Sequence, residues 1–180
     1  MEIFFEGIVL RPWTISDASQ LALIANNRKI ADNVRDGFPF PYSLKDAREW
    51  LNIILPENNP ARFFAIIVDK QLAGSIGIVS KTGIYRKNFE IGFFLSENLW
   101  GKGIATKAIK AATSYAFRDF DIVRVYAESF ADNAGSRKAL EKAGFRLEAT
   151  LKKSIIKNNI IKDSCIYSVL REEFKFSIAD

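Results

Sequence analysis

Four segments of the chain place apolar residues at the three- and four-residue spacing of an amphipathic helix. Each begins at a capping side chain or a glycine, which are typical helix starts. The segments begin after Ser16-Asp17, after Ser43, at Gly103 and after Asp132-Asn133. Pro56 follows the second segment and Gly144 the fourth, as expected of helix ends. The pattern therefore predicts four helices, and the one that starts at Gly103 is the longest.

Short apolar runs with turn residues between them predict seven strands. Their ranges are 8–11, 62–68, 72–80, 89–96, 122–127, 145–150 and 160–170. The second, third and fourth runs follow one another without a helix, so we expect an antiparallel meander. The strand after the long helix then pairs in parallel through a right-handed crossover. The predicted fold is mixed α/β, with a twisted, mostly antiparallel central sheet, one parallel βαβ unit and flanking helices.

Residues 26–42 fit neither pattern. They contain Asn26-Asn27, Asp36-Gly37 and two aromatic residues, Phe38 and Phe40, each followed by a proline. Aromatic side chains on such a segment either line a substrate site or cover the core, and the sequence leaves both interpretations open.

Composition adds limits to this picture. With 180 residues, of which 48% are hydrophobic and 26% charged, the chain is expected to form one globular domain over residues 1–180. Apolar runs fall far short of the roughly 20 residues of a membrane span. The segment Met1 to Gly7 lacks the basic and long apolar regions of a signal peptide. We therefore expect a cytoplasmic protein that does not bind membranes.

The net charge is +5, from 26 Lys and Arg residues against 21 Asp and Glu residues, and it is spread along the chain. A nucleic-acid-binding protein is disfavoured, because basic and aromatic residues are not interleaved. A modest positive charge suits the binding of a small polyanionic ligand.

Histidine is absent, and cysteine occurs once, as Cys165. Catalytic Ser-His-Asp or Cys-His groups and histidine-ligated metals are thereby excluded, and no metal is expected. Cys165 lies in an apolar run and is interpreted as a core residue. Acid–base chemistry must fall to Glu, Asp, Tyr, Lys or water.

The stretch from Glu90 to Ile109 reads as a strand, a short turn, a loop with two glycines and a helix start. Backbone N–H groups in such a loop, together with the positive end of the helix dipole, are suited to bind phosphate. The spacing of Gly101 and Gly103 fits neither a Walker loop nor the Gly-x-Gly-x-x-Gly/Ala fingerprint, because position 106 is Thr.

A second pattern downstream gives this loop a family context. The chain resembles the GNAT superfamily of acyl-CoA-dependent N-acetyltransferases, and most of all its ribosomal-protein N-terminal acetyltransferase branch. The family motif Arg/Gln-x-x-Gly-x-Gly/Ala matches Trp100-x-x-Gly103-x-Ala105, with Trp in place of Arg/Gln. The second signature matches Asn133, Ser136, Gly144 and Phe145. The resemblance covers essentially the whole chain.

The resemblance implies an acyltransferase that moves the acetyl group of acetyl-CoA to a primary amine by direct attack. It also implies that the strand before the loop bonds the pantetheine arm and that the loop holds the pyrophosphate. The predicted contacts to acetyl-CoA are Phe94, Leu95, Ser96, Gly101, Lys102, Gly103, Ile104, Ala105, Thr106 and Asn133.

Two residues are the predicted catalytic groups. By resemblance, Glu90 is a general base acting through water, and Ser136 protonates the departing thiolate. Read from the sequence alone, Glu90 is equally a surface residue at a strand start, and Ser136 equally a first-turn hydrogen-bonding residue. Some relatives carry a glutamate as the base on the next strand, where this chain has Ile155. The expected base is therefore Glu90 or water alone. Tyr167 is a weaker alternative for the acid.

The acceptor is left open between a protein N-terminus and a small amine. A polyamine is disfavoured, because no strong acidic cluster marks the expected acceptor segments 26–42, 85–89 and the last hairpin. The alternative function is a non-catalytic acyl-CoA-binding regulatory module of the same fold. A homodimer is compatible with the sequence.

Overall fold

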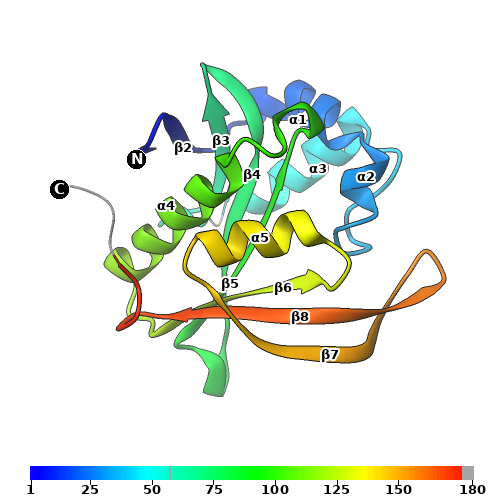
Figure 1. The fold of residues 1–180 in the computed structure, drawn as a ribbon. Coiled ribbons are helices and arrows are strands. Elements are labelled where there is room, and N and C mark those ends of the chain that lie inside the picture. Colours follow the sequence, from blue (N-terminus) through cyan, green and yellow to red (C-terminus); the bar gives the residue numbers. More distant parts are fainter. Residues whose placement is uncertain (57, 176–180) are drawn as a thin grey trace.

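The computed structural model describes residues 1–56 and 58–175. Its strands form one eight-stranded sheet in the order β1-β2-β3-β4-β5-β6-β8-β7 (Figure 1). The strands are β1 (Ile3–Phe5), β2 (Ile8–Pro12), β3 (Phe63–Val68), β4 (Gln71–Ser80), β5 (Asn88–Leu95), β6 (Arg124–Phe130), β7 (Arg146–Lys157) and β8 (Ile160–Leu170). The helices are α1 (Ala18–Ala25), α2 (Arg28–Ala31), α3 (Leu44–Ile54), α4 (Ile104–Asp119) and α5 (Ala134–Lys142).

The pairing confirms the predicted mixed α/β fold. Strands β3, β4 and β5 form the antiparallel meander, and β8 pairs antiparallel with both β6 and β7. Strands β5 and β6 are parallel, and the crossover between them carries α4.

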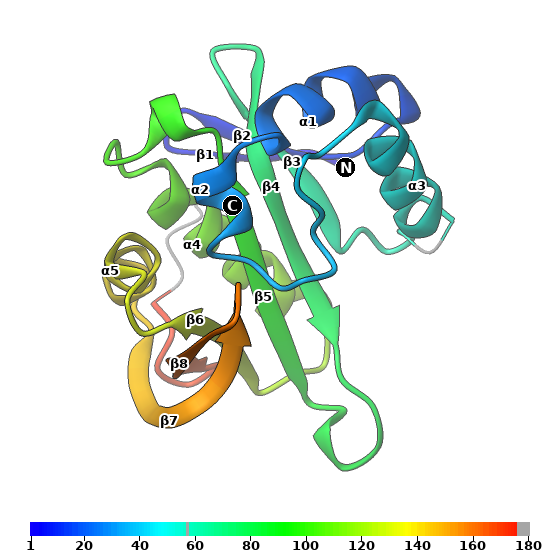
Figure 2. The ribbon, with the colours of Figure 1, turned by 90° about the vertical axis from the view of Figure 1, so that its right-hand side faces the viewer.

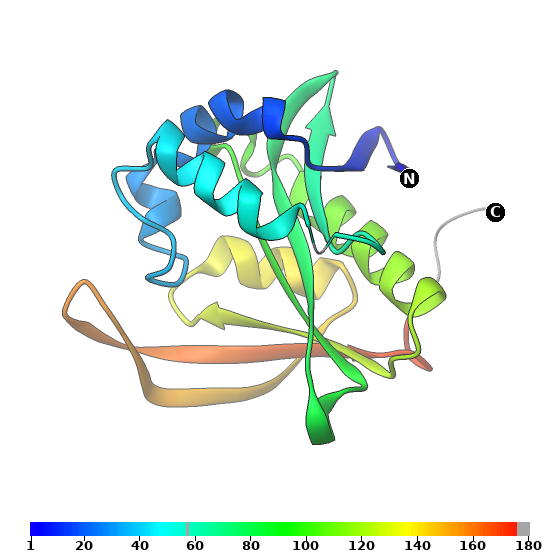
Figure 3. The same ribbon diagram turned by 180° about the vertical axis from the view of Figure 1, so that it is seen from behind.

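Helices cover both faces of the sheet. Seen edge-on, α4 and α5 lie on one side, while α1 and α3 lie on the other (Figure 2). The first layer buries the apolar stripe of α4, including Ala108, Ala112 and Tyr115, against the central strands. The second layer packs Leu21 and Leu51 of α1 and α3 on the opposite face (Figure 3). Strands β3 and β4 are buried on both faces over much of their length, which explains their near-continuous apolar runs.

The structure adds two short elements that the sequence pattern did not predict. Strand β1 shows the alternation of a half-buried strand, since Ile3 and Phe5 are buried and Phe4 is exposed. Helix α2 lies within the segment expected to be irregular, and Asn27 caps it by accepting from the N–H groups of Lys29 and Ile30. Both elements are three or four residues long, too short to show a period.

Strand β7 runs to Lys157, well beyond the predicted end at residue 150. Its pairing with β8 shifts register between Leu151 and Ile155, and Lys153 between them has φ of 51°. A bulge of this kind interrupts the alternation of side chains, which is why the sequence pattern stopped early.

Of the two interpretations left open for the aromatic pair of the 26–42 segment, core covering holds for Phe38 and does not hold for Phe40. Phe38 covers the core, with its ring centroid 4.8 Å from Tyr42 and 5.4 Å from Phe94. Phe40 is 43% exposed. Cys165 is buried, as predicted. Across the described residues, no helix has the length and apolar character required to cross a membrane.

Helix α1 begins at a carboxylate, Asp17. Arg11 donates two hydrogen bonds to it, at 2.7 and 2.8 Å, and the Thr14 N–H donates a third at 2.9 Å. The predicted helix start at Ser16-Asp17 is thus shifted, because a 3-10 turn over Ile15–Asp17 precedes α1. Burial by itself raises the pKa of Asp17, but the bonds from Arg11 and Thr14 outweigh it and lower that pKa.

We predict that Asp17→Asn lowers the free energy of unfolding by about 1–2 kcal/mol at neutral pH, the contribution of a hydrogen bond to a charged group. Because the pKa of Asp17 is lower in the folded protein, this contribution is present above the unfolded-state pKa and is lost as the pH falls through the folded-state pKa. Urea titrations at neutral and acidic pH measure the difference. The control Asp121→Asn removes a carboxylate that is 90% exposed, where solvent screens the charge, and should leave stability nearly unchanged. An equal loss at both pH values for Asp17→Asn contradicts the prediction.

Candidate functional site

The parallel pairing of β5 and β6 is short. It joins Asn88–Glu90 to Arg124–Tyr126 and then stops, although β5 continues to Leu95 and β6 to Phe130. On their other sides, β5 stays paired with β4 and β6 with β8 along these continuations. The two strands therefore diverge just after Glu90.

The antiparallel ladder between β4 and β5 shows which main-chain groups face this divergence. Lys81 N–H donates to Asn88 C=O, and Ser96 N–H donates to Ala73 C=O at 2.8 Å. Because hydrogen-bonded pairs alternate along such a ladder, Phe94 and Ser96 turn their main chain toward β4. Phe93 and Leu95 turn theirs toward β6.

This alternation refines the predicted cofactor contacts on β5. Leu95 has its N–H on the diverging side, while its C=O accepts from the indole N–H of Trp100 at 2.9 Å. Phe94 directs its side chain to the α1 and α3 layer, against Phe38. Phe93, which was not among the predicted contacts, has its main chain in the position that the resemblance assigns to pantetheine contacts.

The glycine loop follows β5 directly and ends at α4. Gly101 and Gly103 have φ of 75° and 78°, left-handed conformations that other L-residues rarely adopt. At both positions a Cβ would lie more than 4 Å from every other described atom outside its immediate chain neighbours. The loop thus keeps open space beside its backbone.

Helix α4 starts without a capping side chain, because Gly103 is its N-cap residue. The first main-chain hydrogen bond of the helix runs from Lys107 N–H to Gly103 C=O. The N–H groups of Ile104, Ala105 and Thr106 precede it and belong to the unsatisfied set at a helix start. A helix of 16 residues presents its positive end there. Loop and helix together form a cradle suited to an anion.

The predicted loop residues divide by their side chains. Lys102 is exposed, Ile104 is buried in the core, and Ala105 packs against that core. Thr106 donates from Oγ1 to Ala139 C=O of α5 at 3.5 Å. Side chains therefore fix the loop to the body of the protein and leave its backbone facing outward.

The turn before the glycines is anchored to the start of helix α2. Glu97 accepts from Asn27 Nδ2 at 2.8 Å and pairs with Lys29. Helix α2 and the glycine loop are thereby joined, although some 70 residues separate them in sequence.

Asn133 and Ser136 lie at the start of α5. Asn133 is the N-cap, and its Oδ1 accepts from Ser136 N–H at 3.1 Å. The cap role expected for Asn133 is present, and it uses the main chain of Ser136 rather than its hydroxyl. The Ser136 side chain is half-buried.

Glu90 is buried at the point where β5 and β6 diverge. Its Oε2 accepts from Lys81 Nζ at 2.5 Å and from Tyr126 OH at 3.4 Å. Its Oε1 accepts from Arg35 Nη2 at 2.5 Å, and the same nitrogen lies 3.4 Å from Glu128 Oε2. Glu90 is therefore not the solvated surface residue that the sequence left open.

Charge decides the protonation state of this carboxyl. Burial alone raises the pKa of Glu90, but the hydrogen bond from Lys81 and the charge of Arg35 together lower it below its ordinary value. The hydrogen bond with Glu90 in turn raises the pKa of Lys81. Glu90 is ionised at neutral pH and surrounded by two cations.

The four residues around Glu90 were missed from the sequence. Tyr126 and Glu128 share one face of β6, and the parallel register places Tyr126 opposite Glu90. The alternation of side chains along β6 could therefore have predicted that Tyr126 and Glu128 lie on one face of the strand. Lys81 follows from the β4–β5 register, whereas Arg35 lies in an irregular segment that carries no periodic signal.

Two cavities lie near this cluster. One, of about 360 Å³, is lined by Lys81, Tyr85, Asn88, Arg124 and Tyr126. The other, of about 260 Å³, lies between the segment that contains α2 and the β7–β8 turn. Its wall combines acidic Asp32 and Asp36 with basic Arg28 and Lys157, beside Phe38 and Phe40.

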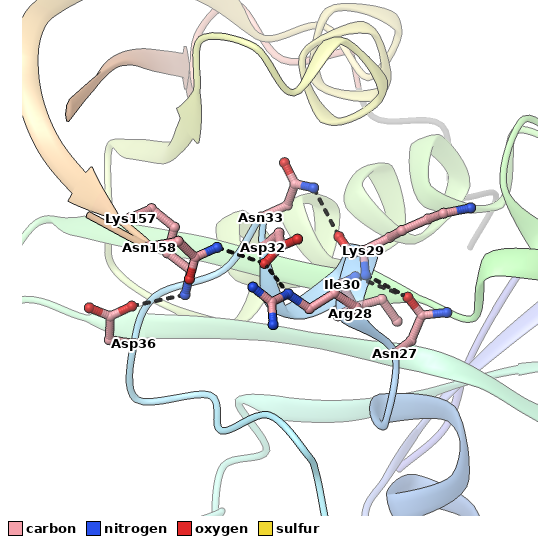
Figure 4. Close-up of polar contacts among 9 residues, drawn as sticks. All are labelled: Asn27, Arg28, Lys29, Ile30, Asp32, Asn33, Asp36, Lys157 and Asn158. Atoms are coloured by element: carbon pink, nitrogen blue, oxygen red, sulfur yellow. Dashed lines mark hydrogen bonds and ion pairs between the residues drawn. The ribbon is translucent and has the colours of Figure 1, made fainter. Parts of the chain in front are cut away.

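The β7–β8 turn is fastened to the chain that follows α2 (Figure 4). Lys157 Nζ donates to Asp36 Oδ1 at 2.9 Å, and Asn158 Nδ2 donates to Asp32 Oδ1 at 2.8 Å. The last hairpin and the 26–42 segment, both expected on the acceptor side, thus meet in the folded protein.

The two weaker candidates lie elsewhere. The Tyr167 hydroxyl is buried, donates to Glu141 at 2.8 Å and accepts from Arg137 at 3.0 Å, and burial raises its pKa. Ile155 lies in β7 at the bulge. Tyr167 is thus held by two residues of α5, away from Glu90.

The donor cradle fits a coenzyme A pyrophosphate on structural grounds alone. It offers left-handed glycines with open space beside them and free helix N–H groups at the end of a strand that has parted from its neighbour. Groups of three or more His, Cys, Asp or Glu side chains arranged to bind a metal do not occur among residues 1–56 and 58–175.

Comparison with known proteins gives the same family. Residues 8–146 match the model of the acetyltransferase (GNAT) domain. The probable N-acetyltransferase YjcK of Bacillus subtilis (strain 168) is 27% identical over 174 residues, which cover 92% of this chain and 95% of the relative. The ribosomal-protein-serine acetyltransferase of Escherichia coli (strain K12) is 27% identical over 150 residues, 81% of this chain and 82% of the relative.

Among solved structures, the microcin C7 self-immunity acetyltransferase MccE superposes with a TM-score of 0.79 at 25% identity. The match covers 92% of this chain and 93% of that one. That protein was crystallised in complex with acetyl-CoA and AMP.

We predict that Gly103→Val weakens coenzyme A binding by more than about tenfold, because a left-handed β-branched residue is strained by about 1–2 kcal/mol and its side chain occupies the open space. Isothermal titration with coenzyme A measures this. Gly37→Val is the matched control, since Gly37 also has open space around it but no left-handed φ. Unchanged affinity in Gly103→Val contradicts the assignment of the loop.

Proposed function

The chain belongs to the GNAT acetyltransferase family, and on that premise we propose that it transfers the acetyl group of acetyl-CoA to a primary amine at the divergence of β5 and β6, with Glu90 as base and Ser136 as acid. The family and its named N-acetyltransferases support an enzyme rather than the non-catalytic acyl-CoA-binding module. They also support acetyl-CoA as the cosubstrate.

One observation carries this proposal. Helix α4 starts without a capping side chain, directly after the loop that contains Gly101 and Gly103. Eight residues separate this start from the end of β5. The helix start therefore places an anion cradle next to a strand edge whose hydrogen-bonding groups are free of β6. A ligand with a pyrophosphate and an amide-bearing arm matches both features.

In the proposed donor site, the N–H groups from Gly101 to Thr106 hold the pyrophosphate. The main chain of Phe93 and the N–H of Leu95 bond the arm, and Phe94 and Ser96 support this edge from the β4 side. Asn133 has its Oδ1 occupied by the α5 cap, so a contact of Asn133 with the arm uses its amide nitrogen. Acetyl-CoA supplies an activated acetyl group as a thioester.

The proposed chemistry needs three proton transfers. Glu90 accepts a proton from the acceptor ammonium, through a water molecule, which leaves a nucleophilic amine. The amine nitrogen forms a bond to the acetyl carbon as the carbon–sulfur bond breaks, and the sulfur keeps the electron pair. The Ser136 hydroxyl donates its proton to that sulfur. The acylated nitrogen then gives its second proton, through water, to the Ser136 oxygen, which leaves a neutral amide, and the proton on Glu90 is released to solvent.

The acceptor side is formed by the cluster around Glu90, the α2 segment and the β7–β8 turn. Acidic Asp32, Asp36, Glu90 and Glu128 are each paired with a basic residue, so this side carries no unbalanced negative charge. That balance supports a singly charged amine over a polyamine. One relative is named for a ribosomal-protein serine, and a protein N-terminus is the acceptor class that we favour over a small amine.

Several expectations from the sequence stay predictions. They are the single domain over residues 1–180, the cytoplasmic location, the absence of metal and of nucleic-acid partners, and a homodimer.

We predict that Glu90→Gln lowers kcat/KM by about 10²-fold or more, the usual contribution of a general base, and leaves coenzyme A binding unchanged. Thiol release from acetyl-CoA against a panel of N-terminal peptides and small amines measures the rate. Glu49→Gln, on the exposed face of α3, is the matched control and should retain full activity. If no amine in the panel gives thiol release, the result argues against an enzyme. A fully active Glu90→Gln argues against Glu90 as the base.

We predict that Ser136→Ala lowers kcat by up to about 10²-fold without loss of fold. Asn133 accepts from the main-chain N–H of residue 136, so the helix cap survives the substitution. Thiol-release rates together with thermal unfolding separate the two effects, and Ser154→Ala in β7 serves as control. A wild-type kcat would leave Ser136 with no role in the proton transfer.

A further inference from the structure

The two oxygens of Glu90 are held by two different cations. Lys81 Nζ contacts Oε2 and Arg35 Nη2 contacts Oε1, each at 2.5 Å. The Lys81 side chain is 30% exposed and the Arg35 side chain is 70% exposed. Lys81 therefore contacts the carboxylate from the side of the sheet, and Arg35 contacts it from the side of the solvent.

Lys81 is fixed by several neighbours. It follows β4 directly, its N–H is bonded to Asn88 of β5, and its ammonium lies 5.6 Å from the centre of the Tyr126 ring. The Tyr126 hydroxyl also donates to the oxygen that Lys81 contacts. The position of Lys81 is therefore set by two strands and one ring.

Arg35 is held in a different way. Its segment is fastened to the β7–β8 turn on both sides, through Asp32 before it and Asp36 after it (Figure 4). Its guanidinium bonds Glu90 and lies at the edge of hydrogen-bond distance from Glu128. The backbone of the segment is anchored, while the side chain is held by carboxylates alone.

These are the charged and titratable groups that face Glu90. Lys81 comes from the end of β4, Arg35 from the segment after α2, and Tyr126 and Glu128 from β6. An amine acceptor that approaches Glu90 from solvent meets Arg35 first, and both are cations.

We propose that Lys81 and Arg35 are positioning residues for Glu90, with Lys81 as a permanent anchor on Oε2 and Arg35 as an exchangeable clamp on Oε1. Arg35 gives way to the acceptor ammonium and to the water molecule that carries its proton. The inference rests on the proposed function, in which Glu90 is the base. Arg35 lowers affinity for the acceptor, because the two cations compete for one oxygen.

The exchange also changes the strength of the base. Burial favours the neutral form of Glu90, and the two cations oppose burial. The ammonium that replaces Arg35 becomes neutral when it gives up its proton, whereas Arg35 stays charged, so the carboxylate holds that proton more strongly once Arg35 has left. The clamp thus keeps Glu90 a weak base until an amine is in place.

The test is a titration of the Glu90 carboxyl by NMR in protein labelled with ¹³C-glutamate, with Glu90→Gln to assign the signal. Arg35→Ala and Lys81→Met should both raise the pKa of Glu90, and Lys81→Met more, since Lys81 is less exposed to solvent screening. Arg35→Lys keeps a cation and should restore much of the wild-type value. Methylguanidinium added to Arg35→Ala should lower the pKa of Glu90 again. Arg118→Ala, which removes an arginine of similar exposure at the far end of α4, should change nothing.

Kinetics supply a second readout. The acid limb of kcat/KM should move to higher pH in Arg35→Ala, and KM for the most active peptide of the panel should fall severalfold while KM for acetyl-CoA stays the same. A Glu90 pKa that is equal in wild type, Arg35→Ala and Lys81→Met overturns the clamp. An inactive wild type, or a fully active Glu90→Gln, overturns the proposed function instead, and the NMR titration distinguishes the two failures because it needs no acceptor.

Discussion

The hydrogen bonding between β5 and β6 ends after three residue pairs, and the functional half of the structure depends on this limit. Both strands continue past it, and each keeps its ladder on the outer side, with β4 and β8. The sheet therefore stays continuous on both outer sides, and the groups of β5 and β6 that face each other across the divergence are left without strand partners. Backbone groups of this kind strongly favour a partner, and a ligand with amide groups provides one without any change in the sheet.

The glycine loop and Glu90 occupy the two ends of the same short strand. Phosphate binding needs backbone N–H groups and open space, which Gly101, Gly103 and the start of α4 provide. Glu90, the base of the proposed mechanism, is a buried carboxylate. Since β5 is paired along its whole length with β4, the distance between the two functions is fixed by a strand rather than by a loop.

Sequence reasoning succeeded where local chemistry decides structure. The long helices, the meander and the glycine loop all follow from spacing within 20 residues. It failed for β1 and α2, which are too short to show a period, and for β7, where a bulge at Lys153 breaks the alternation. The cluster of Lys81, Arg35, Tyr126 and Glu128 was missed for another reason. Its members come from three separate segments and meet at Glu90 on a fourth, and single-sequence patterns carry little information on such packing.

The candidate site shows the same difference between a local motif and long-range packing. Gly101 to Thr106 are contiguous, so their shared role was readable from one motif. Whether Glu90 is buried or solvated depended on residues 35, 81 and 126, so the sequence left that question open.

The fastening of the β7–β8 turn to the chain after α2 bears on how this family diversifies. Most of the proposed donor side is encoded in one continuous stretch, from β5 to the start of α4, whereas the proposed acceptor wall is shared between segments more than 120 residues apart. Changes at Asp36 or Lys157 can alter which acceptor fits the wall without changing the residues that are proposed to hold acetyl-CoA. A lineage that keeps one donor and exchanges acceptors is the natural outcome of that division.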